Sequence, residues 1–335
     1  MQTTRHQYIA RESGAVCDEA LFGDRFVRLM YHGVRENAPG LFRLLTSPRM
    51  TGILGYVNYD LPFASGGSAC ARFLHQLKVD LSECLLRPEE LDTPRKVFER
   101  RIRYWECRPM PERAEEVVSP ADARVLVGSC RDTSSLFIKD KFFSFDELLG
   151  GERLPWLNAL RDGDFALFRL TPDKYHYNHT PVSGEVADIY TIDGEFNSCN
   201  PEAIVAMATP YSKNRRVVTI INTDVKGGSN VGLVAMIEVV ALMIGDIVQC
   251  YSAERYLDPQ PITRGMFVKK GQPKSLYRPG SSTDIVIFQK GRVSFAADLL
   301  ENQARIDATS RFSQGFSIPL VETDIRVRAL LASAR

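Results

Sequence analysis

The feature that most constrains the fold is a series of short β-branched and aromatic segments from about residue 115 onward. Two strands are predicted within 117–127, on either side of a turn around 120–122, and others at 165–170, 189–192, 216–221, 233–243 and 285–288. Turn signals such as Asp193-Gly194 and Gly227-Gly228 separate them. Because these connections leave little room for crossover helices, the pattern predicts a mainly antiparallel β core.

The first part of the chain has helical periodicity instead. The segments with this pattern are 20–31, which puts Phe22, Phe26, Leu29 and Met30 on one face, then 41–45 after the breaker Pro39-Gly40, 68–77 and 95–103. The tail from residue 295 is also expected to end in a helix. We therefore predict an α+β fold with a helical N-terminal region, 1–114, and a β-rich catalytic region, 115–335, as one continuous domain.

Composition excludes several classes of protein. The 335 residues are 44% apolar and 25% charged, as in an ordinary globular protein, and the net charge of +1 gives no general attraction to nucleic acid. Seven single cysteines without a CxxC pair indicate reduced thiols. The N-terminus has no signal-peptide pattern, and the longest apolar run, 231–244, is short and interrupted by Glu238. We expect a cytoplasmic protein, at most peripheral on a membrane.

A basic cluster occupies the last predicted helix of the N-terminal region. Its members are Arg95, Lys96, Arg100, Arg101 and Arg103, followed by Arg108. Such a cluster is typical of a solvated helix face. It would equally suit contact with anionic lipid head groups, where each basic residue contributes about 1 kcal/mol.

Two segments are candidates for chemistry. In 274–288, the small residues Gly280, Ser281, Ser282 and Thr283 come just before an apolar strand, so a tight turn would deliver a hydroxyl to the start of that strand. In 168–181, two of the five histidines of the chain, His176 and His179, lie three positions apart. A Gly-Ser turn feeding a core strand is common, so the first segment alone does not establish a site.

Familiar sites do not fit these residues well. A zinc site needs further ligands beside His176 and His179, and Cys199 is the nearest candidate. Residues 227–232 lack the Gly-Lys-Ser/Thr ending of a phosphate-binding loop. A hydrolase triad of Ser282, His179 and Asp122 is chemically reasonable, but the Gly-x-Ser-x-Gly pattern is absent and the doubled serine stays unexplained.

A Gly-Ser-Ser turn also permits self-cleavage. The Ser282 hydroxyl can attack the preceding carbonyl carbon, which converts the peptide bond into an ester. A base then removes the α-proton, elimination cuts the chain, and the new end loses ammonia to become a pyruvoyl group. This chemistry needs an activated hydroxyl, a positioned base and donors for an oxyanion.

Three motifs in order resemble the phosphatidylserine decarboxylases over most of the chain. They are 119–123 (Ser-Pro-Ala-Asp-Ala), 172–179 (Pro-Asp-Lys-Tyr-His-Tyr-Asn-His) and 280–283 (Gly-Ser-Ser-Thr). Departures from the family pattern are Ala123 for glycine, the order Asp173-Lys174, Val240 for glycine, and Pro279 and Ser281 in the turn.

The resemblance implies roles for individual residues. Asp122 would orient His179, and His179 would be the general base in self-cleavage and later a proton donor. His176 would position the substrate or the cleavage loop, or else be a packed core histidine. Ser282 would become the pyruvoyl group, with Ser281 as the other candidate for the cleavage serine. The resemblance implies no other cofactor, neither metal nor pyridoxal phosphate.

Three functions remain open at this point. The first is decarboxylation of phosphatidylserine to phosphatidylethanolamine and carbon dioxide at a membrane surface. The second is the same pyruvoyl chemistry on a free amino acid, and the third is a chain that no longer cleaves and serves as a binding module. A peripheral membrane contact and a homodimer of cleaved protomers are compatible with the first two.

Overall fold

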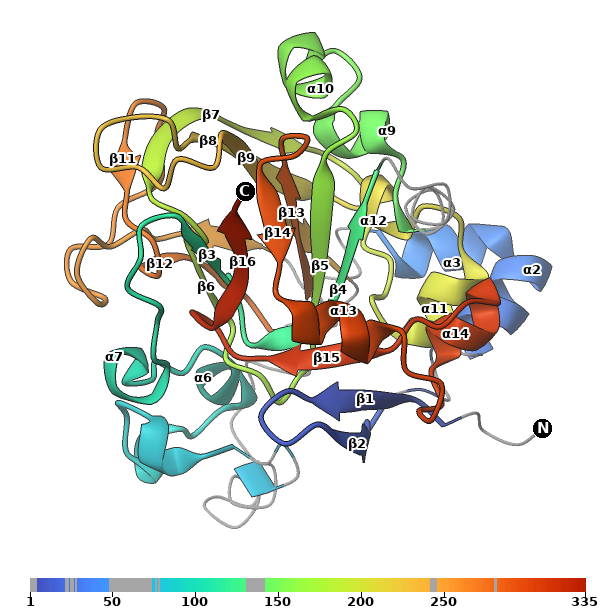
Figure 1. Ribbon diagram of the computed structural model, residues 1–335. Helices are drawn as coiled ribbons and strands as arrows, with labels where there is room; N and C mark the ends of the chain where they lie inside the picture. Colours follow the sequence, from blue (N-terminus) through green and yellow to red (C-terminus); the bar gives the residue numbers. More distant parts are fainter. Residues whose placement is uncertain are drawn as a thin grey trace.

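A ten-stranded sheet forms the centre of the computed structural model, which describes residues 5–21, 24, 27, 29–47, 74–75, 77, 79–130, 142–241, 246–279 and 282–335 (Figure 1). The strand order is β11-β7-β8-β9-β13-β5-β4-β15-β1-β2. These strands are β1 (Gln7–Ala10), β2 (Ala15–Asp18), β4 (Ala123–Ser129), β5 (Asp164–Leu170), β7 (Gly184–Ile192), β8 (Arg216–Asn222), β9 (Leu233–Val240), β11 (Phe267–Val268), β13 (Ser282–Phe288) and β15 (Glu322–Ile325). All neighbours are antiparallel except β1 and β15, so the predicted antiparallel core is confirmed.

Two three-stranded sheets cover one face of the large sheet. One is β10 (Ile247–Gln249), β12 (Pro273–Tyr277) and β6 (Tyr177–His179), and the other is β14 (Val293–Phe295), β16 (Leu330–Ala334) and β3 (Glu116–Val118). Residues of both small sheets, including Tyr277 and Leu331, belong to one core cluster with Val286 and Phe288 of β13. This layer brings β12 against the central strand β13.

Helices cover the opposite face. Ile285 and Ile287 of β13 point to a second core cluster, which includes Leu148 and Phe312 from the helices of this layer. The helices that contribute residues to this second cluster are α9 (Phe145–Leu149), α10 (Leu154–Leu160), α11 (Pro201–Ala206), α12 (Pro210–Lys213) and α14 (Arg311–Phe316), and next to α11 lie η1 (Leu29–Val34), α2 (Arg35–Asn37) and α3 (Pro39–Leu45). The other helices are η3 (Leu81–Glu83), η4 (Pro88–Glu90), α6 (Pro94–Phe98), α7 (Tyr104–Cys107) and α13 (Ala297–Gln303). Of these, α13 packs on the face of the small sheets through Leu299, while α6 and α7 contact the segment of β6 through Phe98 and Tyr104. Since β13 is buried on both faces, its apolar residues form a continuous run.

Within its described residues, the N-terminal region is less helical than predicted. It begins with β1 and β2, which extend the edge of the large sheet beyond β15. Phe22 and Phe26 lie outside the described residues, while Leu29 is 62% exposed and Met30 is buried, so these last two do not share a face. The predicted helix at 95–103 is split, because α6 ends at Phe98 and α7 begins at Tyr104. In the described part of the chain, no helix is long and apolar enough to cross a membrane.

The chain ends in a strand and not in the predicted helix. β16 pairs with β3 and β14, so the last residues close the small sheet beside the turn that carries Asp122. The strand has only five residues, which form no alternating pattern, and long-range pairing with residues 116–118 decides their conformation.

A buried charge network fastens β1 and β15 to the centre of the sheet. Arg169 of β5 donates to Glu322 of β15 at 2.5 Å and to Glu19 at 2.6 Å, and the ring of His6 lies 2.9 Å from Glu322. His6, Glu19 and Glu322 are close enough to one another to suit a metal ion. The Arg169 guanidinium binds both carboxylates and that of Arg124 lies 3.7 Å from Glu19, so we interpret the group as a structural network.

Candidate active site

Ser282 lies at the first position of the central strand of the large sheet. It is opposite Leu170, the last residue of β5, and Val240, the last residue of β9. Its side chain is fully buried, and its Oγ has no hydrogen-bond partner in the described part of the molecule. Ser281 and Gly280 lie outside the described residues. A buried hydroxyl without a partner is costly, which marks this end of the sheet as a candidate site.

The chain brings the other two motifs to the same end of the sheet. After Leu170 the chain turns through His176 into β6, which carries His179 and pairs with β12. Tyr277, the last residue of β12, donates its N–H to the His176 carbonyl at 3.1 Å, and His179 donates its N–H to Pro120 O at 2.7 Å. The register therefore puts His176, more than His179, beside the end of β12 that leads to Ser282.

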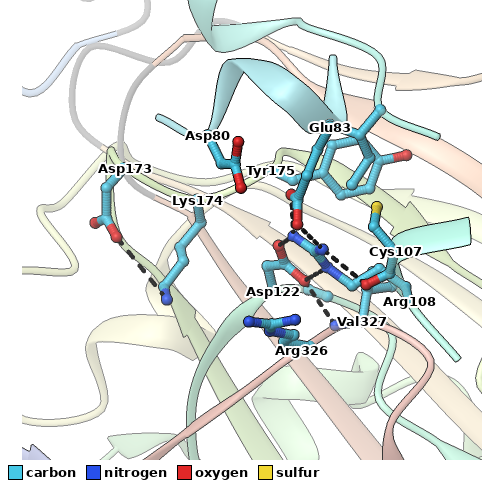
Figure 2. A network of polar contacts seen from close by, with 12 residues as sticks. Asp80, Glu83, Cys107, Arg108, Asp122, Asp173, Lys174, Tyr175, Arg326 and Val327 are labelled. Carbon is cyan, nitrogen blue, oxygen red and sulfur yellow. Dashed lines mark hydrogen bonds and ion pairs between the residues drawn. The ribbon is translucent and has the colours of Figure 1, made fainter. Parts of the chain in front are cut away.

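Asp122 is the centre of an ion-pair network (Figure 2). Arg108 donates to its carboxylate from Nε at 3.0 Å and from Nη2 at 2.8 Å, and the Val327 N–H donates at 2.7 Å. Arg108 also binds Glu83 of η3, through Nη1 at 2.7 Å and Nη2 at 2.9 Å. Burial alone would raise the pKa of Asp122, but the charge and hydrogen bonds of Arg108 hold that pKa below its ordinary value. Asp122 is therefore a carboxylate at neutral pH.

His179 is held by two other groups. Its Nδ1 donates to the Gly271 carbonyl at 2.9 Å, which leaves Nε2 to accept from the Tyr175 hydroxyl at 3.0 Å. Tyr104 packs edge-on against the ring. Burial lowers the pKa of His179 to about 3, so its imidazole is neutral.

The expected contact between Asp122 and His179 is not made in this structure. Both Asp122 oxygens accept from Arg108, and both His179 nitrogens bond to other groups. The physical reason is competition, because a bidentate bond from a guanidinium is stronger than a bond from a neutral imidazole. The two residues are nevertheless near one another, since the His179 N–H donates to the carbonyl of Pro120, two residues before Asp122, at 2.7 Å.

His176 is a buried imidazole stacked on Phe98 of α6, with ring centres 3.8 Å apart. Neither ring nitrogen has a hydrogen-bond partner among the described residues. Burial, followed by the nearby charge of Arg100, lowers its pKa to about 3. The ring is therefore neutral and offers a lone pair, as a base would.

A cavity of about 250 Å³ lies on the same face of the sheet, one strand away from Ser282, which does not line it. Val240 lines it, and residues directly opposite one another on antiparallel strands have side chains on one face, about 5 Å apart. Val217, Ile247 and Ile262 give the cavity an apolar wall, and among the described residues Arg215 is its only cation and Asp246 its only carboxylate.

Each member of the predicted basic cluster binds another group of the protein, and two of the six, Arg100 and Arg108, are buried. Arg95 pairs with Glu99, and Lys96 pairs with Asp92. The rest bind backbone or side-chain groups: Arg100 to the Asp173 carbonyl, Arg101 to the Tyr177 hydroxyl, Arg103 to the Cys84 carbonyl, and Arg108 to Asp122. Both interpretations from the sequence, a solvated face and a lipid-binding patch, are therefore wrong for Arg100 and Arg108, which are buried.

Sequence reasoning missed Arg108 as a partner of Asp122 and Tyr175 as a partner of His179. The pairing of Arg108 with Asp122 left no signal in the sequence, because Arg108 follows five other basic residues and does not differ from them in pattern. Tyr175 belongs to the histidine motif itself, so its position next to His176 was a usable signal. Glu238 was a second usable signal, because it interrupts an apolar run and a lone charge in a buried strand needs partners.

Comparison with known proteins agrees with the geometry. The family model described as phosphatidylserine decarboxylase matches residues 95–314, about two thirds of the chain. A phosphatidylserine decarboxylase proenzyme of Fusobacterium nucleatum is 26% identical over 90% of this chain and 93% of the relative. The Clostridium tetani proenzyme is 30% identical over 68% of this chain and 71% of its own length. A rice protein, phosphatidylserine decarboxylase proenzyme 2, is 32% identical over 70% of this chain and 35% of its own length.

The matched region contains the Asp122 turn, both histidines and Ser282, the residues that the fold gathers at one end of the sheet. The resemblance seen in the three motifs is thereby confirmed over a continuous stretch. This chain belongs to the phosphatidylserine decarboxylase family, and is a carboxy-lyase.

Proposed function

We propose that the chain cuts itself before Ser282, converts that residue into a pyruvoyl group, and decarboxylates phosphatidylserine to phosphatidylethanolamine. The observation that carries this proposal is the fully buried Ser282 hydroxyl, which has no hydrogen-bond partner among the described residues, at the convergence of the three motifs. The relatives' printed names also support it, because a proenzyme is a chain that matures.

Ser282 suits conversion into a pyruvoyl group. The conversion removes a side-chain hydroxyl, and here that hydroxyl has no bond in the described structure to lose. In the first step, Oγ attacks the carbonyl carbon of residue 281, the bond between that carbon and the Ser282 nitrogen breaks, and an ester forms. A pyruvoyl carbonyl supplies an electrophile for the substrate amine and accepts the electron pair that carbon dioxide leaves behind.

The neutral histidines are the candidates for proton transfer. Either imidazole can take a proton at a free nitrogen lone pair: His176 at a nitrogen without a partner, and His179 at Nε2 once the Tyr175 hydroxyl turns away. We retain His179 as the general base in self-cleavage, oriented by Asp122 after a local rearrangement, and His176 as the residue that positions the substrate.

The cavity that Val240 lines, one strand away from Ser282, is our candidate for the substrate head group. Its apolar wall suits the carboxylate that leaves, because the negative charge there is lost in the reaction. Arg215 suits the phosphate of a phospholipid. Its ion-pair partner in the described structure, Asp193, is exposed and 3.8 Å away, so a phosphate can compete for the guanidinium.

One set of measurements tests the function. Intact mass of the purified protein should show a long fragment ending at Ser281 and a short, blocked fragment that begins with residue 282. Carbon dioxide release is then measured with phosphatidylserine vesicles and, separately, with the common amino acids. A single uncut chain in active protein would refute self-cleavage, and release from an amino acid alone would replace the phospholipid as substrate.

An Arg215→Gln variant refines the test. It should cleave itself normally but show a higher KM for phosphatidylserine. Arg161→Gln, which replaces an exposed arginine at the C-terminal end of α10, should leave the protein unchanged in both respects. An unchanged KM would remove Arg215 from the substrate site.

A further inference from the structure

A buried polar network lies next to Ser282, between the large sheet and β12, and the reaction described above does not use it. At its centre is Glu238 of β9, which accepts from Lys274 Nζ at 2.7 Å and from Gln249 Nε2 at 2.9 Å. Ser275 and Asn178 also donate to Glu238. The side chains of Lys274 and Glu238 are both fully buried, so this is an ion pair without solvent.

Asp284 faces this network. Side chains alternate along a strand, and Val286 and Phe288 point into the core cluster that contains Tyr277. Asp284 and Ser282 therefore lie on that same face. Asp284 is directly opposite Glu238 in the strand register, so two buried carboxyl groups share one dry site.

Only one of these two carboxyl groups can carry a charge at low cost. Glu238 accepts four hydrogen bonds, one of them from an ammonium group, so it is the ionised member. Burial and the charge of Glu238 raise the pKa of Asp284 well above its ordinary range. Asp284 is therefore a neutral acid and a hydrogen-bond donor.

Tyr277 connects Asp284 to the main chain beside Ser282. Its hydroxyl oxygen lies 3.0 Å from the Thr283 carbonyl oxygen and 2.7 Å from Asp284 Oδ1. One phenolic hydrogen cannot serve two acceptors fully. A neutral Asp284 resolves the conflict, since it donates to the Tyr277 oxygen while Tyr277 donates to the Thr283 carbonyl.

We propose that Tyr277 and Asp284 are positioning residues that fix the main chain at Thr283, and thereby hold residue 282 in place during and after self-cleavage. This inference rests on the proposed function. It adds two residues that none of the three motif roles includes.

The chemistry of self-cleavage explains why a hydrogen bond to the main chain at Thr283 is needed. Conversion to a pyruvoyl group removes the nitrogen of residue 282, and with it any main-chain N–H at that position. The first intact peptide group of the new fragment is the one between residues 282 and 283, and the next begins with the Thr283 carbonyl. Tyr277 stays on the fragment that ends at residue 281, so its hydroxyl holds the new chain end from across the cut.

The central experiment compares Tyr277→Phe with Tyr251→Phe. Both tyrosines are buried in the same core cluster, and Tyr251 also loses one hydrogen bond, from the Lys269 N–H at 2.9 Å. Tyr277→Phe should slow self-cleavage about tenfold, as expected for one buried hydrogen bond to the reacting segment. In the fraction that has cleaved, kcat for phosphatidylserine should fall while KM stays the same. Tyr251→Phe should leave both rates unchanged.

A second pair of variants tests the neutral acid. Asp284→Asn keeps an N–H donor for the Tyr277 oxygen and should cleave at nearly the normal rate, whereas Asp284→Leu removes the donor and should cleave as slowly as Tyr277→Phe. Equal loss in both variants would overturn the assignment of Asp284 as a donor. If Tyr277→Phe fails to fold, the comparison of Asp284→Asn with Asp284→Leu still tests the positioning role.

The outcomes separate this inference from the proposed function. If the unchanged protein cleaves and decarboxylates phosphatidylserine, but Tyr277→Phe matches Tyr251→Phe in every rate, the positioning role is wrong and the function stands. If the unchanged protein neither cleaves nor decarboxylates, the function itself fails, and the positioning role fails with it.

Discussion

Replacing Arg108 with methionine tests the ion-pair network around Asp122. The substitution keeps much of the side-chain volume but leaves the Asp122 carboxylate, which is 8% exposed, without its bidentate partner. Removing one partner of a buried ion pair typically costs about 3–5 kcal/mol. We expect a loss in this range at pH 7, because the Glu83 carboxylate also loses its partner.

The pH dependence makes the prediction specific. In the unchanged protein the pKa of Asp122 is lowered on folding, so its contribution to stability is present above the unfolded pKa and disappears as the pH falls through the folded pKa. Without Arg108, burial dominates and the folded pKa of Asp122 rises above the unfolded one. The variant should therefore be most destabilised at pH 7 and much less so near pH 4, where Asp122 is protonated.

Urea denaturation at several pH values measures this difference, with Arg87→Met as the matched control. The Arg87 side chain pairs with Glu90 at 3.4 Å on the surface, so its loss should cost well under 1 kcal/mol. A double variant, Arg108→Met with Asp122→Asn, should lose much less than the sum of the two single losses. Equal destabilisation by Arg108→Met at pH 7 and pH 4 would refute the ion-pair argument.

Three further predictions concern the reaction and the membrane. Asp122→Asn and His179→Ala should remain folded but stay largely uncleaved on a denaturing gel. If Asp122 acts as the aspartate of a triad does, Asp122→Asn should slow self-cleavage on the order of 10⁴-fold. Cleavage at the normal rate in either variant would exclude a role for the replaced residue. Decarboxylation should survive dialysis against chelators, and borohydride with substrate should inactivate the protein; reactivation by pyridoxal phosphate would contradict a pyruvoyl group. Leu29, Leu41 and Leu44 are 62%, 49% and 56% exposed, so Leu44→Glu should weaken sedimentation with phosphatidylserine vesicles, while Leu300→Glu, on the exposed side of α13, should not.

The strands of the core could be predicted from the sequence because burial on both faces leaves a strong local signal. The predicted segments 165–170, 216–221 and 285–288 all lie within observed strands whose residues are mostly buried. β1, β2 and β16 left no such signal. They are four or five residues long, and their conformation depends on partners such as residues 322–324, which are distant in the sequence.

The residues of the candidate site could be named from motif order, but their contacts could not. Motif order predicts that Asp122, His176, His179 and Ser282 gather together, and the fold brings their segments to one end of the sheet. Which group binds Asp122 depends on the path of the N-terminal region, which carries Arg108 past the 119–123 turn. No spacing rule links residue 108 to the 119–123 turn. The sequence therefore predicted His179 as the partner of Asp122, whereas in the structure the partner is Arg108.

The two buried ion pairs near the site, Arg108–Asp122 and Lys274–Glu238, are not explained by stability alone. Apolar replacements of a buried pair are often neutral or stabilising, because they avoid the cost of removing charges from water. What the two pairs share is that each fixes a segment of the candidate site: one holds Asp122, and the other ties β12, the strand that carries Tyr277, to Glu238 of β9 opposite Asp284. A double variant, Lys274→Met with Glu238→Leu, should therefore unfold at a urea concentration close to normal and yet cleave itself slowly. Normal cleavage in that variant would mean that the pair contributes only to packing.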